Sequence, residues 1–409
     1  MHNRSYWHAT LDQPALPTTA LPAVAETVVL GAGIHGAAAA YWLARAGMAP
    51  LLIDRAGPAA GATGHNGGLC VTGTAEVYPD AIARLGHADA RAIWARSAEG
   101  FALLQAIVAE EQIACDLRPG GTLTLALGEA HLAGFKRSIV ALAADDFHQE
   151  LLDRPAAEAL LGLPLGPEIL GGKYNPHAAT LHSARLVYGL LAAAVRHGAR
   201  LCWGAEVTGI AADAAGVRLQ TSQGALSAGA VVVALNAWSG DLLPFLKGVI
   251  TPVRGQALAT APFAPTLPCG FGAPLTPTGE YGQQTATGAL IFGGCRAAAP
   301  GGDSGVRDMQ PSAEVQAALD AGLTRLFPTL AGVPVERRWA GLMGFTPDYV
   351  PVAGAAPGLP GVWFAGGFSG HGMPFAPIFG RLLAEAVATG ATPAALAPFR
   401  LDRPGLASA

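Results

Sequence analysis

The stretch "ETVVLGAGIHGAAAAYWLARAGMAPLLIDRA", residues 26–56, decides the fold. Its apolar run Thr27–Leu30 is typical of a buried parallel strand, and a glycine-rich turn follows it at once. Residues 37–46 then predict a helix, which Gly47 is well placed to end. The "PLLID" of residues 50–54 predicts a second buried strand. Together the three elements predict a βαβ unit.

The turn "GAGIHG" carries the GxGxxG pattern at Gly31, Gly33 and Gly36, and Asp54 lies 23 residues after Gly31. Gly31 permits the tight turn, Gly33 lets the backbone approach a pyrophosphate, and Gly36 lets the helix lie close to the strand. The free N–H groups at the helix N-terminus favour phosphate. Asp54 can accept hydrogen bonds from a ribose 2′-OH and would repel a 2′-phosphate, so NADP is disfavoured while FAD and NAD stay open. Further cofactor contacts are expected from Ile34, Arg55 and His35, the last being otherwise an ordinary helical residue.

A second glycine-rich turn before a helix stands near the other end, in "GVWFAGGFSGHGMPFAPIFGRLLAEAVATG", residues 361–390. Residues 362–365 predict a strand, and a helix is predicted from Pro374 because proline is favoured in a first turn. Two helix N-termini suit a long cofactor held at both ends, and the second could face the pyrimidine edge of a flavin. A surface strand–turn–helix is the alternative. The turn residues expected at the cofactor are Gly367, Phe368, Ser369, Gly370, His371, Gly372 and Met373.

The stretch "GATGHNGGLC", residues 61–70, follows the second predicted strand and has no strong helix or strand pattern. A metal site, a phosphate cradle, a free surface loop and a wall beside a cofactor are all open interpretations. The wall is favoured, because the sequence offers no second cluster of metal ligands and glycines let a backbone approach a flat cofactor. The expected lining residues are Gly61, Ala62, Thr63, Gly64, His65, Asn66, Gly67 and Gly68, and no metal is expected.

The whole-chain totals limit the kind of protein. The 409 residues suit two domains or one elaborated domain, and a composition that is 51% apolar can fill a large core. A net charge of -4 without a block of Lys or Arg argues against nucleic acid as a partner. Five scattered cysteines without CxxC spacing suggest neither zinc nor a redox pair. Neither a signal peptide nor a transmembrane segment is recognised, so a cytoplasmic protein is expected.

The motifs and their order resemble the D-amino-acid-oxidase-type (DAO) FAD-dependent oxidoreductases, a family that includes glycine oxidase, monomeric sarcosine oxidase and D-amino acid dehydrogenases. Beside the βαβ unit, the motifs that carry the resemblance are "PVRGQ" at 252–256, "RWAGLMGFTPDYVPVAG" at 338–354 and "GFSGHGM" at 367–373. Three further segments are similar to the gamma-glutamylputrescine-oxidase-like branch. They are "SYWHAT" at 5–10, "GHNGG" at 64–68 and "CDLRPGGTLTLAL" at 115–127.

The helix and strand patterns predict an interleaved α/β architecture (α+β overall), and the resemblance implies the same division. A Rossmann-like FAD-binding domain is expected to interleave with a mixed-sheet substrate-binding domain, as in glycine oxidase and sarcosine oxidase. The segments assigned are an N-terminal arm at 1–24, the FAD-binding domain at 25–95, 178–250 and 336–409, and the substrate-binding domain at 96–177 and 251–335. Residues 85–113 and 184–199 are predicted helices, and 122–127 and 230–238 are predicted strands.

The resemblance also implies an activity: oxidation of the C–N bond of an amine or amino acid by hydride transfer to flavin N5, giving an imine that water hydrolyses. FAD is the implied cofactor, and O2 or another acceptor would take the electrons. A quinone- or carrier-linked dehydrogenase of D-amino or secondary amino acids is the alternative, and a non-catalytic FAD-binding module is a third interpretation. The further cofactor contacts that the resemblance implies are Val207, Asn236, Ala237, Trp238, Gly341 and Met343.

Three side chains are candidates for contact with the reacting groups: His65, His371 and Tyr281. His65 is compatible with a loop histidine, with a position against the flavin ring, and with a covalent bond to the flavin 8α carbon. Its segment is similar in spacing to dimethylglycine-dehydrogenase-like relatives that bind flavin covalently, whereas the closer branch usually has arginine there and non-covalent FAD, which is the expectation. His371 could pack, polarise the flavin or tune substrate protonation. Tyr281, at the start of a strand with Gln283 and Gln284, either meets substrate or is a core tyrosine.

Two positions depart from the family pattern, and one arginine has two possible roles. Met343 stands where monomeric sarcosine oxidase has the cysteine that holds its flavin, so that linkage is excluded. Ile291 falls near the place of the lysine thought to promote the oxygen reaction, which leaves an electron-transfer dehydrogenase open. Arg254 is expected to be structural rather than a carboxylate anchor, and the sequence does not distinguish an amine from an amino acid as the substrate.

Overall fold

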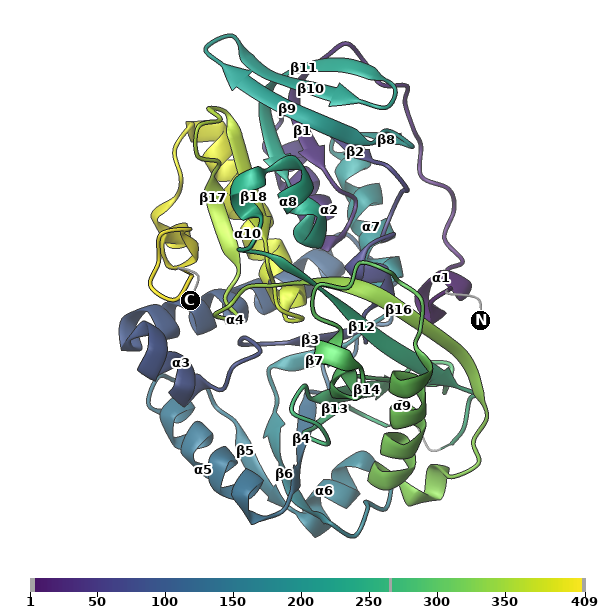
Figure 1. Cartoon of the computed structure of the whole chain (residues 1–409). Helices are drawn as coiled ribbons and strands as arrows, with labels where there is room; N and C mark the ends of the chain where they lie inside the picture. The colour runs from purple at the N-terminus through teal and green to yellow at the C-terminus, as the bar shows by residue number, and fades with distance from the viewer. Residues whose placement is uncertain (1–3, 265–266, 407–409) are drawn as a thin grey trace.

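The computed structural model describes residues 4–264 and 267–406, whose strands form two eight-stranded sheets and a two-stranded ribbon (Figure 1). The first sheet occupies the upper part of the view and the second sheet the lower part. Each sheet combines parallel and antiparallel pairs, so the predicted mixed α/β fold is confirmed. Within the described ranges, no helix is both long enough and apolar enough to cross a membrane.

The first sheet is built around the predicted βαβ unit. Its strand order is β17-β18-β11-β1-β2-β8, and the hairpin of β9 and β10 extends from β11. β1 pairs in parallel with β2 and β11, and β11 with β18, as expected for buried apolar strands. The strands are β1 Val24–Leu30, β2 Leu51–Asp54, β8 Arg200–Trp203, β9 Val207–Asp213, β10 Gly216–Thr221, β11 Gly224–Val233, β17 Val352–Ala355 and β18 Val362–Gly366.

Helices beside this sheet pack at very close range through glycine. A Cβ atom at Gly380 of α10 would lie 2.6 Å from the backbone carbon of Ala38 in α2. A Cβ atom at Gly100 of α4 would lie 1.9 Å from the backbone oxygen of Pro374 in α10. These contacts place α10 directly against α2 and α4, and the α2–α10 contact helps to fix where the N-termini of these two helices point. The helices in this part are α2 Ile34–Arg45, α3 Tyr78–Leu85, α4 His87–Glu110, α7 Ser183–Arg196, α8 Ser239–Leu242 and α10 Gly372–Thr389.

The second sheet has the strand order β16-β12-β15-β14-β13-β4-β6-β5. One of its faces is filled by an apolar cluster that includes Leu123, Leu125 and Phe292. On the other face a single row of paired residues runs Tyr281, Gly272, Thr124, Lys173. The strands are β4 Thr122–Leu127, β5 Glu150–Asp153, β6 Ile169–Asn175, β12 Thr251–Thr260, β13 Gly270–Ala273, β14 Glu280–Gln284, β15 Leu290–Gly293 and β16 Val335–Phe345. The helices with this sheet are α5 Glu129–Ala143, α6 Arg154–Leu161 and α9 Ala313–Leu326, and the ribbon joins β3 Leu69–Val71 to β7 Ala178–Thr180.

Several predicted element boundaries were wrong. α2 begins at Ile34, three residues before the predicted start, because the hydroxyl of Thr63 receives the Ile34 N–H and starts the helix early. α10 begins at Gly372, so Pro374 lies inside its first turn and not at its start. The predicted strand 230–238 ends at Val233, and Asn236–Trp238 form a 3-10 turn.

Two elements cross the predicted domain division. The predicted helix 85–113 corresponds to α4, and Gly86, with a φ of +84°, separates it from the preceding α3. α4 then continues without a break past the proposed boundary at residue 95. β16 was grouped with the FAD-binding segments, yet it lies in the second sheet, since it pairs antiparallel with β12 from Val335 to Phe345.

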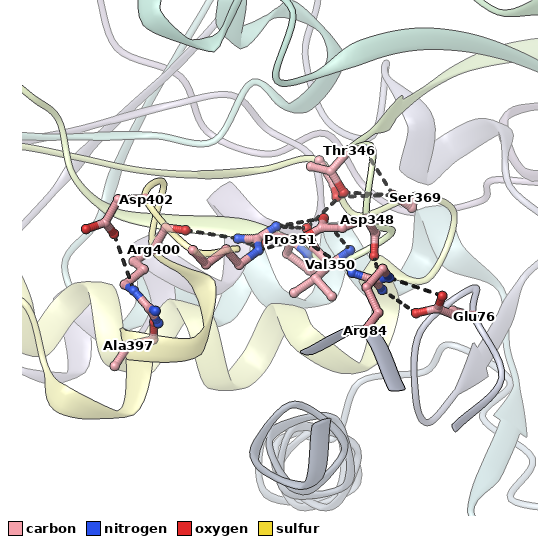
Figure 2. A network of polar contacts seen from close by, with 12 residues as sticks. Glu76, Arg84, Thr346, Asp348, Val350, Pro351, Ser369, Ala397, Arg400 and Asp402 are labelled. Atoms are coloured by element: carbon pink, nitrogen blue, oxygen red, sulfur yellow. Dashed lines mark hydrogen bonds and ion pairs between the residues drawn. The ribbon is translucent and has the colours of Figure 1, made fainter. Parts of the chain in front are cut away.

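A buried ion pair ties the C-terminal segment to the loop after β16. Arg403 and Asp348 are 3% and 1% exposed, and the guanidinium donates to both carboxylate oxygens at 2.7 and 2.9 Å. Arg403 also donates to the backbone oxygens of Val350 and Pro351. Figure 2 shows Arg84 on the other side of Asp348, where it also pairs with Glu76, and Thr346 beside Ser369. The pair therefore holds the loop that borders the glycine-rich turn before α10.

Candidate active site

A cavity of about 1310 Å3 lies between the two sheets. This volume exceeds the roughly 300–1,000 Å3 of an ordinary ligand pocket, so it can hold a long cofactor together with a second molecule. Its walls come from the βαβ turn, the loop after β2, the turn before α10 and the polar face of the second sheet. The predicted site residues that line it are Gly31, Gly33, Ile34, His35, Asp54, Arg55, Gly61, Ala62, Thr63, His65, Asn66, Gly67, Val207, Asn236, Ala237, Trp238, Tyr281, Gly341, Met343, Phe368, Ser369, Gly370, His371, Gly372 and Met373.

The βαβ turn places the N-terminus of α2 at the cavity. Gly31 has a φ of +104°, and a Cβ atom there would lie 2.7 Å from the backbone oxygen of Ala234. A Cβ atom at Gly36 would lie 1.8 Å from the backbone oxygen of Gly31, so α2 can start only with glycine at that position. Gly33 faces the cavity, and a Cβ atom added there would lie 3.4 Å from Thr63 Oγ1. The Ile34 N–H is taken by Thr63 Oγ1, so the remaining first-turn amides of α2 are the ones from which a pyrophosphate in the cavity would accept hydrogen bonds.

Asp54 holds the turn together at the end of β2. Its carboxylate accepts the N–H of Ala32 at 2.8 Å, and those of Ala56 and Gly57 at 2.7 and 2.8 Å. The carboxylate has further lone pairs and lines the cavity, so it can still accept from a ribose hydroxyl. The neighbouring Arg55 lies 4.5 Å from the Trp238 ring, which closes this end of the cavity.

The loop of residues 61–70 is a fixed wall, so the free-loop interpretation was wrong. Four backbone oxygens of the loop are held by three side chains from distant segments. Trp7 Nε1 donates to Asn66 at 2.7 Å and Trp339 Nε1 donates to His65 at 2.9 Å. Gln283 Nε2 donates to Gly67 and Gly68 at 3.0 and 2.7 Å. In the described part of the chain, no group of three or more His, Cys, Asp or Glu side chains is placed to hold a metal ion.

His65 presents a neutral ring to the cavity. Its Nδ1 lies 2.9 Å from the backbone oxygen of Gly61, which can only accept, so Nδ1 carries the hydrogen and Nε2 keeps a lone pair. Burial lowers the pKa of His65, which keeps the ring uncharged at neutral pH. The β-carbon packs on Gly341 of β16, where an added Cβ atom would come within 2.4 Å. The lone pair of Nε2 is therefore free for a ligand.

The turn before α10 is anchored to the first sheet and to β16. Asn236 Oδ1 accepts the N–H of Gly367 at 3.0 Å, and the N–H of Ser369 donates to the backbone oxygen of Gly344 at 2.8 Å. His371 Nδ1 donates to the backbone oxygen of Ser369 at 3.4 Å, and burial lowers the pKa of His371. A second neutral imidazole and a second helix N-terminus thus face the cavity.

Four predicted cofactor residues do not reach the cavity, and each has a structural role instead. Gly36 lies under the turn against Gly31, as described above. Gly64 fits between the backbone oxygen of Ala59 and the His8 ring, and Gly68, with a φ of +70°, fits against Gln283. Gly367, with a φ of +69°, lies against Thr346. His35 does line the cavity, but its ring stacks on Phe368 at 3.6 Å, and burial lowers its pKa to about 3.

The opposite wall of the cavity comes from the second sheet. The Tyr281 ring fits between two glycines, since Cβ atoms at Gly67 and Gly293 would lie 2.6 and 2.7 Å from it. Burial raises the pKa of Tyr281, so its hydroxyl stays protonated and can donate. Arg254 pairs with the buried Asp303 at 2.8 Å and does not line the cavity, in keeping with the structural role expected for it.

Two cationic residues in the cavity were missed by sequence reasoning. Arg296, next to Tyr281, stacks over Phe345 at 5.0 Å and forms no direct ion pair among the described residues, although Asp303 and Glu280 lie close enough to act on its charge. Lys173 of β6 also lines the cavity without an ion pair in the described part of the chain. One sequence signal could have led to Lys173. "TLTLAL" alternates Thr with Leu, which indicates a polar face on β4, and β6 pairs with that strand.

The N-terminal arm adds a titratable contact that predicts pH-dependent stability. His182 caps α7: its Nδ1 accepts the Arg185 N–H at 3.2 Å, and its Nε2 donates to Thr10 Oγ1 at 3.1 Å. Burial lowers the pKa of His182 to about 4, below its unfolded value of 6.5, so the unfolded state binds the proton more readily. We expect the free energy of unfolding to fall as pH drops from 6.5 towards 4.

His182→Asn keeps an N-cap acceptor but removes the titration. Between pH 7 and pH 5, urea denaturation should therefore show a loss of stability about 1–2 kcal/mol smaller in the variant than in the wild type. Equal losses in the two proteins would contradict the assignment. Burial also lowers the pKa values of His8 and His35. Both histidines are present in the variant and in the wild type, so their contribution to the pH dependence cancels in the comparison.

A βαβ turn, an acid at the tip of β2 and a second helix N-terminus around one elongated cavity define a nucleotide-cofactor protein of the Rossmann type. Comparison with protein families makes this specific. Residues 26–386 match the family described as FAD dependent oxidoreductase (DAO), and the chain belongs to that family.

Known relatives cover almost the whole chain. The gamma-glutamylputrescine oxidoreductase of Escherichia coli is 27% identical over 94% of this chain and 88% of its own length. The glycine oxidase of Pseudomonas aeruginosa is 28% identical over 88% of this chain and 94% of its own. Among solved structures, glycine oxidase from Geobacillus kaustophilus superposes with a TM-score of 0.79 at 23% identity, covering 93% of this chain and 99% of the other, which establishes the shared fold.

Proposed function

We propose that this protein is an FAD-dependent oxidoreductase that oxidises the C–N bond of an amine or amino acid. The observation that carries the proposal is the single cavity that receives both helix N-termini and then continues over the polar face of the second sheet. The first part matches the two ends of FAD, and the second leaves room for a small donor. The names of the relatives, which are amine and amino-acid oxidoreductases, support the same class of donor.

The chain offers a separate group to each part of FAD. Asp54 would accept from the adenosine ribose, the amides at the start of α2 would bind the pyrophosphate, and the loop 61–67 would lie along the cofactor towards its ring. The amides at the start of α10 would favour negative charge at the pyrimidine edge. When bound, FAD supplies the hydride acceptor for the carbon beside the donor nitrogen, after which water hydrolyses the imine.

The donor side of the cavity suits an uncharged amine beside an anionic group. A donor amine must lose its proton before oxidation, and the neutral rings of His65 and His371 can accept one. The Tyr281 hydroxyl can orient the donor by a hydrogen bond. The unpaired Arg296 favours a donor with a carboxylate next to the reacting carbon, so we place amino acids ahead of simple amines.

The experiment is a product assay on purified holoenzyme. Candidate amines, N-methyl amino acids and amino acids of both hands are incubated in air, or with an artificial dye as electron acceptor. The carbonyl product and the released nitrogen are then measured. The expected result is equal yields of the two from at least one donor, and comparing air with dye identifies the kind of acceptor. Tightly bound FAD with no product under either condition would favour a non-catalytic module.

We also infer that FAD is held without a covalent bond. The cavity offers lining residues along its length and two helix N-termini, which would bind the cofactor without a covalent bond. Acid precipitation of the holoenzyme is expected to give a colourless pellet and a yellow supernatant. A yellow pellet in the wild type that becomes colourless in His65→Ala would overturn the inference and identify His65 Nε2 as the attachment atom.

A further inference from the structure

The far end of the cavity contains Lys173, which forms no ion pair with any residue of the described ranges 4–264 and 267–406. Lys173 lies on the cavity side of β6, and its ammonium sits 3.4 Å from Ser138 Oγ and 5.5 Å from the Phe135 ring. The first contact is at the limit of a hydrogen bond, so most of the donor capacity of the ammonium is unused. Burial alone lowers the pKa of Lys173 to about 8, and no described carboxylate offsets it.

The side chains around Lys173 form a distinct recess of the cavity, which we call the alcove. We use this name for the part of the cavity lined by Thr124, Phe135, Ser138, Gln149 and Lys173. β4 and β6 provide its floor, and α5 covers it with Phe135 and Ser138. Gln149 Oε1 is also buried without a hydrogen-bond partner. Burying a polar group without a hydrogen-bond partner destabilises the protein, unless a bound ligand supplies the partner.

The alcove is far from the groups that would meet the reacting carbon. The row Tyr281, Gly272, Thr124, Lys173 crosses three strand-to-strand steps. At about 4.8 Å for each step, the backbones of Tyr281 and Lys173 stand roughly 14 Å apart. Arg296 is at the Tyr281 end of this row. The cavity thus has an unpaired cation at each end of its substrate wall.

The other charged groups of the cavity do not account for Lys173. Glu76 pairs with Arg84, Glu206 with Arg55, and Asp241 with Arg307. Glu280 is occupied by the N–H and hydroxyl of Thr276. Asp54 accepts three backbone N–H groups. Among the described carboxylates of the cavity none is left for Lys173, so a ligand could supply the anion that pairs with it.

We propose that the alcove is a second anion-binding subsite, and that the natural donor carries a carboxylate at the end opposite its oxidised C–N bond. Lys173 binds that carboxylate, and Ser138 donates a further hydrogen bond. The inference deepens the proposed function and rests on it for the placing of the donor nitrogen near Tyr281. The subsite excludes donors that end in a second ammonium group, because Lys173 would repel them.

The test uses donors that bind but cannot react. In α-methyl amino acids the nitrogen-bearing carbon has no hydrogen to lose. A series with a terminal carboxylate, from α-methylaspartate through α-methylglutamate to longer homologues, is compared with the corresponding terminal carboxamides. Dissociation constants are measured on the holoenzyme by isothermal titration calorimetry. For one chain length in the series, the compound with the terminal carboxylate should bind about 10- to 100-fold more tightly than the matching carboxamide.

Variants assign this preference to the alcove. Lys173→Met has nearly the same shape without the charge, and the ratio of carboxylate to carboxamide affinity should fall to about one. Lys173→Arg should restore part of it. Lys136→Met removes the same charge from the exposed side of α5 and should keep the wild-type ratio, which excludes a general effect of net charge. FAD content checks that each variant is folded.

Two results would overturn the subsite. The wild type could bind carboxylates and carboxamides equally at every length, or the preference could survive in Lys173→Met. Either result leaves the proposed function standing if other donors are still oxidised. Loss of the proposed function would appear differently, as FAD-loaded protein that yields no product from any donor.

Discussion

Gly36→Ala is expected to give protein that does not retain FAD. The added Cβ atom would lie 1.8 Å from the backbone oxygen of Gly31, and neither backbone can move without displacing the turn that carries the cofactor amides. We expect a loss of at least about 3 kcal/mol in the free energy of unfolding, together with loss of bound FAD. FAD absorbance per protein after gel filtration, and denaturation by urea, measure the two effects.

Gly134→Ala is the matched control for this substitution. Gly134 lies within α5, where the nearest atom to an added Cβ is a flexible Arg137 nitrogen at 3.9 Å. Alanine should be tolerated there or stabilise the helix by about 0.5–1 kcal/mol. FAD retention in Gly36→Ala equal to that in Gly134→Ala would show that the βαβ turn does not form as described.

Arg403→Ala should destabilise the protein by about 3–5 kcal/mol. The substitution leaves the buried Asp348 carboxylate with Arg84 at 3.9 Å as its remaining cationic partner, and it removes the donors for the oxygens of Val350 and Pro351. Because this loop borders the turn before α10, FAD affinity should fall as well. The measurement is urea denaturation of the apoprotein, followed by FAD titration of the folded variant.

Arg400→Ala, three residues away, is the control. Arg400 is 43% exposed in its side chain and pairs with Asp402 at 3.4 Å, as Figure 2 shows. Exposed pairs of this kind contribute about 0–1 kcal/mol. If the two variants lost similar stability, the buried pair would not be the clamp that we describe.

The sequence predicted which residues of the βαβ turn line the cavity, because the signals for that unit are local. Gly31, Gly33 and Asp54 belong to one short unit whose turn, helix and strand follow each other along the chain. The turn before α10 is equally compact, although its helix starts at Gly372 and not at Pro374. Where a boundary was wrong, a distant side chain was the cause, as with Thr63 at the start of α2.

The substrate half was largely missed, because it depends on contacts between segments far apart in sequence. Lys173 and Tyr281 share a row only after β14, β13, β4 and β6 have paired. The loop 61–70 looks free in sequence, yet Trp7, Trp339 and Gln283 hold its backbone from three different parts of the chain. No pattern around residue 65 contains those partners.

The most direct test of the central claim is anaerobic reduction of the bound flavin. Holoenzyme under nitrogen is titrated with amines, N-methyl amino acids and amino acids of both hands, and the visible absorbance band of the flavin is followed. At least one class should bleach the band with one donor consumed per FAD. If every donor leaves the band intact while dithionite bleaches it, this protein is not an oxidoreductase of C–N bonds.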